Sequence, residues 1–384
     1  MTTASSHPTA GRLARKRAVF VDILKLIVAL QMMNGHTLNE FLLPSLQTGE
    51  FFYHYTHFRG LVSVGFLVCA GFSFHLATLA RFDEHRRTPR AHHKRVVRAL
   101  VLVALGYILR FSNTIWSDQP YYAHEAYLNF IRADALQCIG LTLLVLEAMT
   151  AVARHPRQVA LGATLLAIAA TAGAPLVDPA VATDGPWLFL TAYLTHQFGS
   201  LFPIAPWSGF MFGGVALGYL TFGNGQSSTV QVRIRLSLAA IAIFGIGYIT
   251  LLPGFPRPPA GYHPGASPGH VLYKMGEILV ALSVLSWISS GVTRLPKALA
   301  ILASETLTLY IVHLAILYRW PIALVSLIGA RAMTVGQGLV ASALVVTLTI
   351  LITLAKHAAW PYLLNLKATV RSIAAAARRR RESA

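Results

Sequence analysis

Apolar residues occur along this chain in long runs that short polar segments separate. Ten runs of about 18–25 residues stand out, and each is long enough for an α-helix to cross a hydrocarbon core of about 30 Å. The pattern therefore predicts an all-α polytopic membrane protein, a bundle of about ten transmembrane helices. The expected limits of the runs are 18–41, 59–80, 96–115, 132–153, 158–174, 199–221, 234–252, 272–290, 299–319 and 336–357.

The charges between these runs alternate in sign along the chain. Every second connection is rich in Lys and Arg, while the connections between them are poor in basic residues and carry most of the loop carboxylates. Cytoplasmic loops carry the excess of basic residues in membrane proteins. Both termini are therefore expected in the cytoplasm, with the chain in the plasma (inner) membrane. The basic segments are 12–17, 81–98, 154–157, 233–235, 294–297 and 367–381.

The overall composition agrees with a membrane location. Hydrophobic residues make up 55% of the 384 residues and charged residues only 12%, whereas a soluble protein carries about 25% charged residues. The mean hydropathy is +0.57. The net charge of +18 would otherwise suggest nucleic-acid binding, but the basic residues lie in short loops between apolar runs. A nucleic-acid partner is therefore not expected.

The chain is expected to form one membrane domain with two basic tails. Residues 1–17 form a basic cytoplasmic tail, residues 18–357 a single transmembrane domain, and residues 358–384 a second basic cytoplasmic tail. The run Arg378–Arg381 in the second tail is typical of a segment that binds anionic lipid.

The sequence offers little sign of disulfide or metal chemistry. Cys69 and Cys138 both lie inside apolar runs, which is typical of packing residues rather than of a disulfide framework. We recognise no metal-ligand spacing, phosphate-binding loop or dinucleotide fingerprint. No bound metal or cofactor is therefore expected.

The first apolar run contains an unusual group of polar residues. Its stretch 31-QMMNGHTLNE-40 includes Asn34, His36 and Glu40, although a polar group in hydrocarbon is costly unless it is paired or faces a cavity. On a helix, Lys25 points within about 20° of His36, some 16 Å along the axis. Either the helix emerges into water here and His36 is an interfacial residue, or this face lines a site.

Other polar residues are expected at the same level of the membrane. Arg132, Asp134 and Gln137 open the fourth run, and His313 lies in the ninth. The alternating direction of the helices brings all of these to the outer side, around one cavity. For Arg132 alone, an interfacial anchor is an equal alternative.

Four stretches of the sequence resemble a known family. They are 17-RAVFVDILKLIVALQMMNGH-36, 136-LQCIGL-141, 202-FPIAPW-207 and 302-LASETLTLYIVH-313. Together they resemble the transmembrane acyltransferase superfamily, which includes acyltransferase-3 type proteins and the heparan-alpha-glucosaminide N-acetyltransferase-like group. The first stretch carries the family's Asp at Asp22 and its His at His36, with Lys25 where Arg is usual.

This resemblance implies an acyltransferase. The acyl group, usually acetyl, would come from cytoplasmic acyl-CoA as a co-substrate and pass to a hydroxyl or amine of an extracytoplasmic glycan or lipid-linked saccharide. His36 would be the general base or the acyl carrier, because imidazole titrates near neutrality. Glu40 or Asp134 would orient its ring, and Lys25 would contact the CoA phosphates.

The remaining polar residues would bind the substrates. Asn34, Arg132, Gln137 and His313 are expected to hold the acceptor or to polarise the thioester carbonyl. The alternative to an acyltransferase is a secondary transporter or a flippase for a glycan or lipid-linked substrate, which also places charged residues within its spans. Transporters often show matching broken helices in two halves, and we recognise no such repeat in the sequence.

Overall fold

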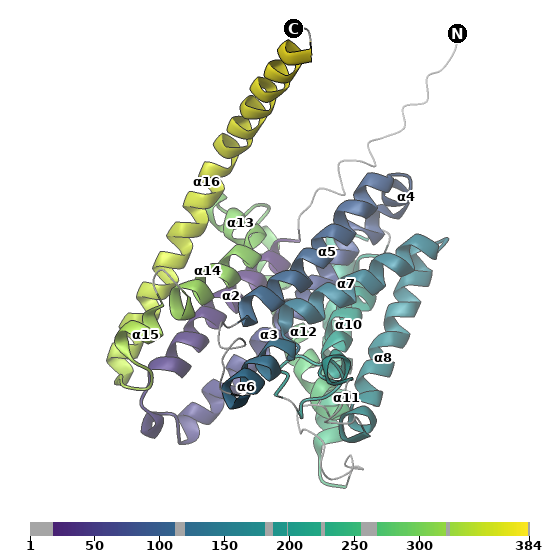
Figure 1. Ribbon diagram of the computed structural model, residues 1–384. Helices are drawn as coiled ribbons and strands as arrows, with labels where there is room; N and C mark the ends of the chain where they lie inside the picture. Colours follow the sequence, from purple (N-terminus) through teal and green to yellow (C-terminus); the bar gives the residue numbers. More distant parts are fainter. Residues whose placement is uncertain are drawn as a thin grey trace, which may run out of the picture. The chain divides into compact units, whose positions relative to one another are not determined.

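The computed structural model describes residues 18–111, 120–180, 187–197, 199–223, 227–254, 267–319 and 323–382. The basic tail expected at residues 1–17 lies outside them. Within these ranges the chain is helical, and the only backbone pairing of the strand type is an isolated bridge between Leu42 and Met333. The prediction of an all-α protein is confirmed (Figure 1).

The chain divides into two compact units. The first unit contains residues 1–24 and 63–293, and the second contains residues 25–62 and 294–384. Helices α2 (Val19–Phe41) and α3 (Glu50–Ala77) each contribute residues to both units.

The first unit contains most of the helices. Its strongest packing pairs are α5 with α7, α8 with α10, and α11 with α12. Its elements after α3 are η2 (Leu79–Arg81), α4 (Phe82–Arg86), α5 (Pro89–Arg110), α6 (Pro120–Ile131), α7 (Ala135–Val152), α8 (Pro156–Ala180), α9 (Leu188–Thr191), α10 (Ile204–Phe222), α11 (Thr229–Leu251), α12 (Pro268–Ile288) and η5 (Ser289–Gly291).

Glycines allow the closest of these helix contacts. Gly247 of α11 faces the backbone of Tyr273, and Gly276 of α12 faces the backbone of Phe244. A Cβ atom at either glycine would overlap those backbone atoms. Helices in lipid associate largely through such close packing, because the hydrophobic effect does not drive two apolar surfaces together there.

The start of α10 follows its prolines. Pro203 precedes the first turn of the helix, and Ala205 just before Pro206 has non-helical backbone angles. Proline cannot donate a backbone hydrogen bond and restricts the residue before it. Cys69 and Cys138 are buried and form no disulfide, as expected for packing residues.

The second unit is built around the end of α2. Its other elements are η1 (Pro44–Leu46), the first part of α3, α13 (Lys297–Ser304), α14 (Thr306–Tyr318), α15 (Leu324–Ile328) and α16 (Val335–Glu382). Phe41 at the end of α2 packs with Ile316 and Leu317 of α14 and with Val345 of α16 in a buried core. Backbone hydrogen bonds join Met333 to Phe41 and Leu43, at 2.8 and 3.0 Å.

The ninth expected helix, residues 299–319, is in fact two helices. Helices α13 and α14 meet at an angle of 77°, and Glu305 lies between them. The Glu305 carboxylate accepts hydrogen bonds from Thr308 and Lys356, both at 2.6 Å. The expectation of one continuous helix is therefore wrong, because a charged side chain bonded to α16 occupies the break.

The described helices include seven that are long and apolar enough to cross a membrane, or eight if the bent pair α13–α14 is one span. The protein is therefore a multi-pass membrane protein. Helix α16 continues for 48 residues, well past the expected limit of the tenth span at residue 357 (Figure 1).

Candidate functional site

Two histidines meet in the second unit. His36 comes from α2 and His313 from α14, and their ring centroids are 5.3 Å apart with the ring planes inclined by 49°. His36 is exposed, whereas His313 is completely buried. The first and ninth apolar runs thus contribute one imidazole each to the same place, as the sequence predicts.

The His313 ring is held in one tautomer. Its Nδ1 lies 3.0 Å from the backbone carbonyl oxygen of Leu309, and a carbonyl only accepts, so Nδ1 carries the proton. The other ring nitrogen, Nε2, is buried and has no hydrogen-bond partner among the described residues. The Tyr310 ring packs edge-on against the imidazole at 5.7 Å. His313 therefore offers a fixed acceptor nitrogen beside His36.

Glu40 lies one helical turn beyond His36 on α2. The Tyr318 hydroxyl of α14 forms a hydrogen bond with its carboxylate, and its backbone carbonyl accepts the N–H of Arg331 at 2.7 Å. Residues four apart on a helix are neighbours. Glu40 is therefore held close to His36 on the same face of α2.

Two hydrogen bonds hold the polar residues that flank His36. The Ser342 hydroxyl of α16 donates to Asn34 Oδ1 at 2.8 Å. Arg59 Nη1 of α3 donates to Asn39 Oδ1 at 2.7 Å. These contacts fix the face of α2 between residues 34 and 39.

Arg59 passes directly over the residue before His36. A Cβ atom at Gly35 would lie 2.9 Å from both Cγ and Cδ of Arg59, so any larger residue there would require the arginine side chain to shift. Our sequence interpretation did not select Arg59, Tyr318 or Ser342. Of these three residues, Arg59 alone stands out in the sequence, because it is a cation at the boundary of an apolar run in a region otherwise poor in basic residues.

Lys25 lies on the same helix as His36 but at a distance from the histidine pair. The two residues are eleven positions apart, which corresponds to about 16 Å along the axis of α2. Lys25 is partly buried. It is therefore not part of the cluster around His36.

The three residues predicted from the fourth run belong to the first unit. Asp134 caps α7: its carboxylate accepts the N–H of Ala135 at 2.7 Å and pairs with Arg110 Nε at 3.1 Å. Gln137 completes this capping box by accepting the N–H of Asp134 at 3.3 Å, and Arg132 lies two residues before the cap. Asp134 and Gln137 thus have a structural role as the cap of α7.

The cluster of the second unit, His36 with Glu40, Asn34, Arg59 and His313, is suited to proton transfer. It combines an exposed imidazole, a second imidazole with a fixed acceptor nitrogen, a carboxylate and a guanidinium. A base of this kind removes a proton from a hydroxyl or amine, and a nearby cation or amide stabilises an oxyanion.

Comparison with known families identifies a match over more than half of the chain. The model of a family described as heparan-alpha-glucosaminide N-acetyltransferase, catalytic, matches residues 17–252. This range contains His36, Glu40, Asn34 and Arg59, and it ends before His313. No curated protein and no solved structure matches the chain significantly.

Proposed function

Because the chain belongs to the heparan-alpha-glucosaminide N-acetyltransferase family, we propose that it moves an acetyl group from cytoplasmic acetyl-CoA to an extracytoplasmic saccharide. The acceptor is a hydroxyl or an amine of a glycan or of a lipid-linked saccharide. The observation that carries this proposal is the exposed His36 ring packed against the buried His313 ring, 5.3 Å away. An acyl transfer to a weak nucleophile needs such a base.

In the proposed reaction His36 accepts the proton of the acceptor. The acceptor oxygen or nitrogen attacks the thioester carbonyl, a new C–O or C–N bond forms, the C–S bond breaks, and the CoA thiolate takes up the proton that His36 releases. Glu40 positions the His36 ring, and Asn34 and Arg59 stabilise the oxyanion. A route in which His36 itself carries the acyl group uses the same residues.

His313 serves this reaction as a neighbour of the base. Its Nε2 is the acceptor nitrogen of a neutral imidazole whose Nδ1 is committed to Leu309. It can therefore accept a hydrogen bond from the acceptor saccharide or from His36. We therefore assign His313 to the residues that bind substrate, the role expected from the sequence.

The test of this function is transfer of label from acetyl-CoA. Purified protein in proteoliposomes, given acetyl-CoA labelled in the acetyl group and a saccharide with a terminal α-glucosaminide, is expected to yield labelled acceptor. Acceptors with the amine or one hydroxyl blocked identify the reacting group. Translocation of the saccharide without any labelled product would favour the transporter or flippase and contradict an acetyltransferase.

Lys25→Met is expected to raise the KM for acetyl-CoA if this cation contacts the CoA phosphates.

We also propose ten spans with both termini in the cytoplasm of a plasma (inner) membrane. Two further helices, added to the seven long apolar helices and to the bent pair α13–α14 counted as one span, make ten. Helix α5 is 22 residues long with most of its basic residues near its start, and α10 is 19 residues long with a non-helical residue near its start. Basic residues in every second connection support this orientation.

Single cysteines test the orientation. In a background without Cys69 and Cys138, Thr88→Cys between α4 and α5 should react with an impermeant thiol reagent only after the cells are opened. Thr48→Cys between α2 and α3 should react in intact cells. Both threonines are exposed, so access to the cysteine is set by the membrane. Labelling of Thr88→Cys in intact cells would show that the proposed orientation is inverted.

A further inference from the structure

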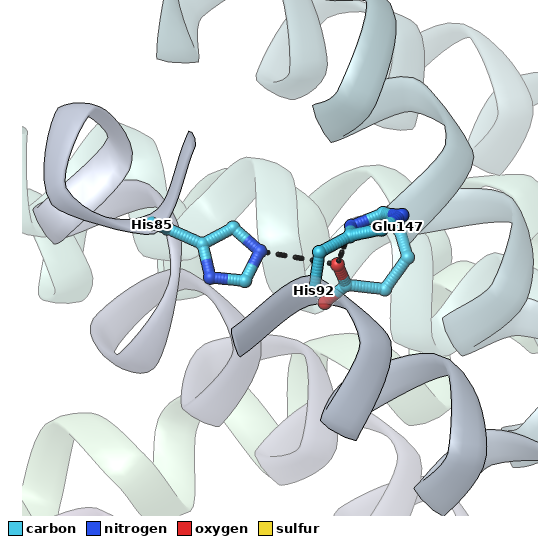
Figure 2. Close-up of side chains that lie close together, drawn as sticks. All are labelled: His85, His92 and Glu147. Atoms are coloured by element: carbon cyan, nitrogen blue, oxygen red, sulfur yellow. Dashed lines mark hydrogen bonds and ion pairs between the residues drawn. The ribbon is translucent and has the colours of Figure 1, made fainter. Parts of the chain in front are cut away.

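A second cluster of histidine and carboxylate lies in the first unit, apart from the residues that the proposed reaction uses. His85 comes from α4, His92 from α5 and Glu147 from α7. Glu147 Oε2 lies 3.2 Å from His85 Nε2 and 3.0 Å from His92 Nδ1. Figure 2 shows both rings turned toward the same carboxylate.

The cluster is buried on one side and open on the other. The exposed fractions of the side chains are 5% for His85, 2% for Glu147 and 36% for His92. Glu147 lies in a helix that is long and apolar enough to cross a membrane, Ala123–Val152. A carboxylate buried in such a helix is costly unless a cation compensates its charge.

The protein side chains compensate this carboxylate only in part. Arg95 Nε is 3.6 Å from Glu147 Oε1, which is an ion-pair distance but too long for a hydrogen bond. Oε1 has no hydrogen-bond partner among the described residues. Both imidazoles therefore converge on one oxygen, while the other oxygen faces a guanidinium.

The spacing of the three ligand atoms is close to that of a metal site. Zinc binds imidazole nitrogen and carboxylate oxygen at about 2.0–2.2 Å, so a tetrahedral ion separates its ligand atoms by about 3.3–3.6 Å. The two measured separations are 3.0 and 3.2 Å, and all three ligand atoms lie within 4.8 Å of one another. Two imidazoles and a carboxylate are a donor set that suits zinc and neighbouring transition metals.

We propose that His85, His92 and Glu147 bind one divalent transition-metal cation of the zinc class. Glu147 Oε2 and the two ring nitrogens are the ligands, and the exposed side of His92 leaves a coordination position open to water. Arg95 is the outer partner of Glu147 Oε1, in keeping with the usual hydrogen-bonded or charged support of ligating carboxylates. The ion joins the short helix α4 to α5 and α7.

This proposal revises the expectation of no metal. The two histidines are seven residues apart, and Glu147 follows His92 by 55 residues. That separation corresponds to no familiar ligand motif, and nothing in the sequence distinguishes Glu147 from other carboxylates. The three side chains come together only in the folded protein, where α4, α5 and α7 meet.

Metal content tests the proposal directly. The full chain, purified in detergent without a polyhistidine tag and desalted into metal-free buffer at neutral pH, is expected to contain about one zinc per chain. His92→Ala and Glu147→Gln should lose that metal. The matched controls are His93→Ala and Glu84→Gln, which remove an exposed neighbour of each ligand type and should retain it.

Thermal unfolding provides a second readout for the half-exposed ligand. After removal of metal with a chelator, added Zn²⁺ should raise the Tm of the wild type and of His93→Ala, because a ligand that binds only the folded state stabilises it. The Tm of His92→Ala should not change. Absence of metal together with no Zn²⁺-dependent shift in the wild type would show a hydrogen-bonded His–Glu–His cluster and overturn the proposal. Equal zinc in wild type and His92→Ala would also overturn it. Neither readout depends on acetyl transfer.

Discussion

His36→Gln is expected to lower the turnover of acetyl transfer by about 10²-fold or more, which is the usual cost of losing a general base. Glutamine keeps a hydrogen-bonding group of similar reach but cannot take up a proton at neutral pH. The His36 side chain is exposed, and its replacement by glutamine adds no charge to the membrane. The fold should therefore be unchanged. The measurement is labelled acetyl transfer in proteoliposomes, normalised to the monodisperse fraction in size-exclusion chromatography.

The matched control for this variant is another histidine of the second unit. His54 lies in α3, and its side chain is 69% exposed beside Glu50. His54→Gln should therefore leave turnover near that of the wild type. Turnover close to normal in His36→Gln would contradict a catalytic role for His36. His313, which contacts it, would then be the next base to test.

Gly276→Leu is expected to abolish the folded protein. A Cβ atom at Gly276 on α12 would overlap the backbone of Phe244 on α11, and a backbone cannot move aside as a flexible side chain can. Overpacking of a core typically costs about 1–3 kcal/mol even where side chains can adjust, so a clash with backbone should exceed this. The measurement is the yield of monodisperse protein from detergent extracts.

Gly245 supplies the control, since it neighbours Phe244 on the same helix α11. A Cβ atom at Gly245 would have nothing within 4 Å, and leucine has a better helix propensity than glycine by about 0.8 kcal/mol. Gly245→Leu should therefore be produced and extracted like the wild type. Normal recovery of Gly276→Leu would mean that α11 and α12 do not approach as closely as described.

The helices and their approximate places could be predicted from the sequence because the membrane restricts the options. In hydrocarbon every backbone group must be satisfied within its own segment, so a long apolar run has to be a helix. The prolines at 203 and 206 likewise indicated where α10 becomes irregular. The break at Glu305 was not predicted, because it depends on Lys356, a residue 51 positions later in the sequence.

The candidate site could be predicted only in part for the same reason. His36 and His313 were identifiable, since imidazole inside an apolar run is unusual and demands an explanation. Their contact and its supports are tertiary: Ser342 bonds to Asn34 across 308 residues, and Arg59 of α3 bonds to Asn39 after passing close to Gly35. Asp134 illustrates a different difficulty. A polar residue at the start of a helix can be a cap, and its position in the sequence does not distinguish a cap from a catalytic residue.

The bend between α13 and α14 sets how deep in the membrane the two histidines lie. Lys356 and His357, which pair with Glu305 at the bend, have side chains that are 41% and 46% exposed, and polar side chains of this kind do not face hydrocarbon. The bend therefore lies at a level that water reaches. From there α14 extends for 13 residues, or about 20 Å, which is less than the roughly 30 Å of a hydrocarbon core. His313 is eight residues, about 12 Å, beyond the bend. In the proposed reaction, an acetyl group that enters on the side of the bend would thus reach the two histidines near mid-depth, after crossing less than half of the hydrocarbon.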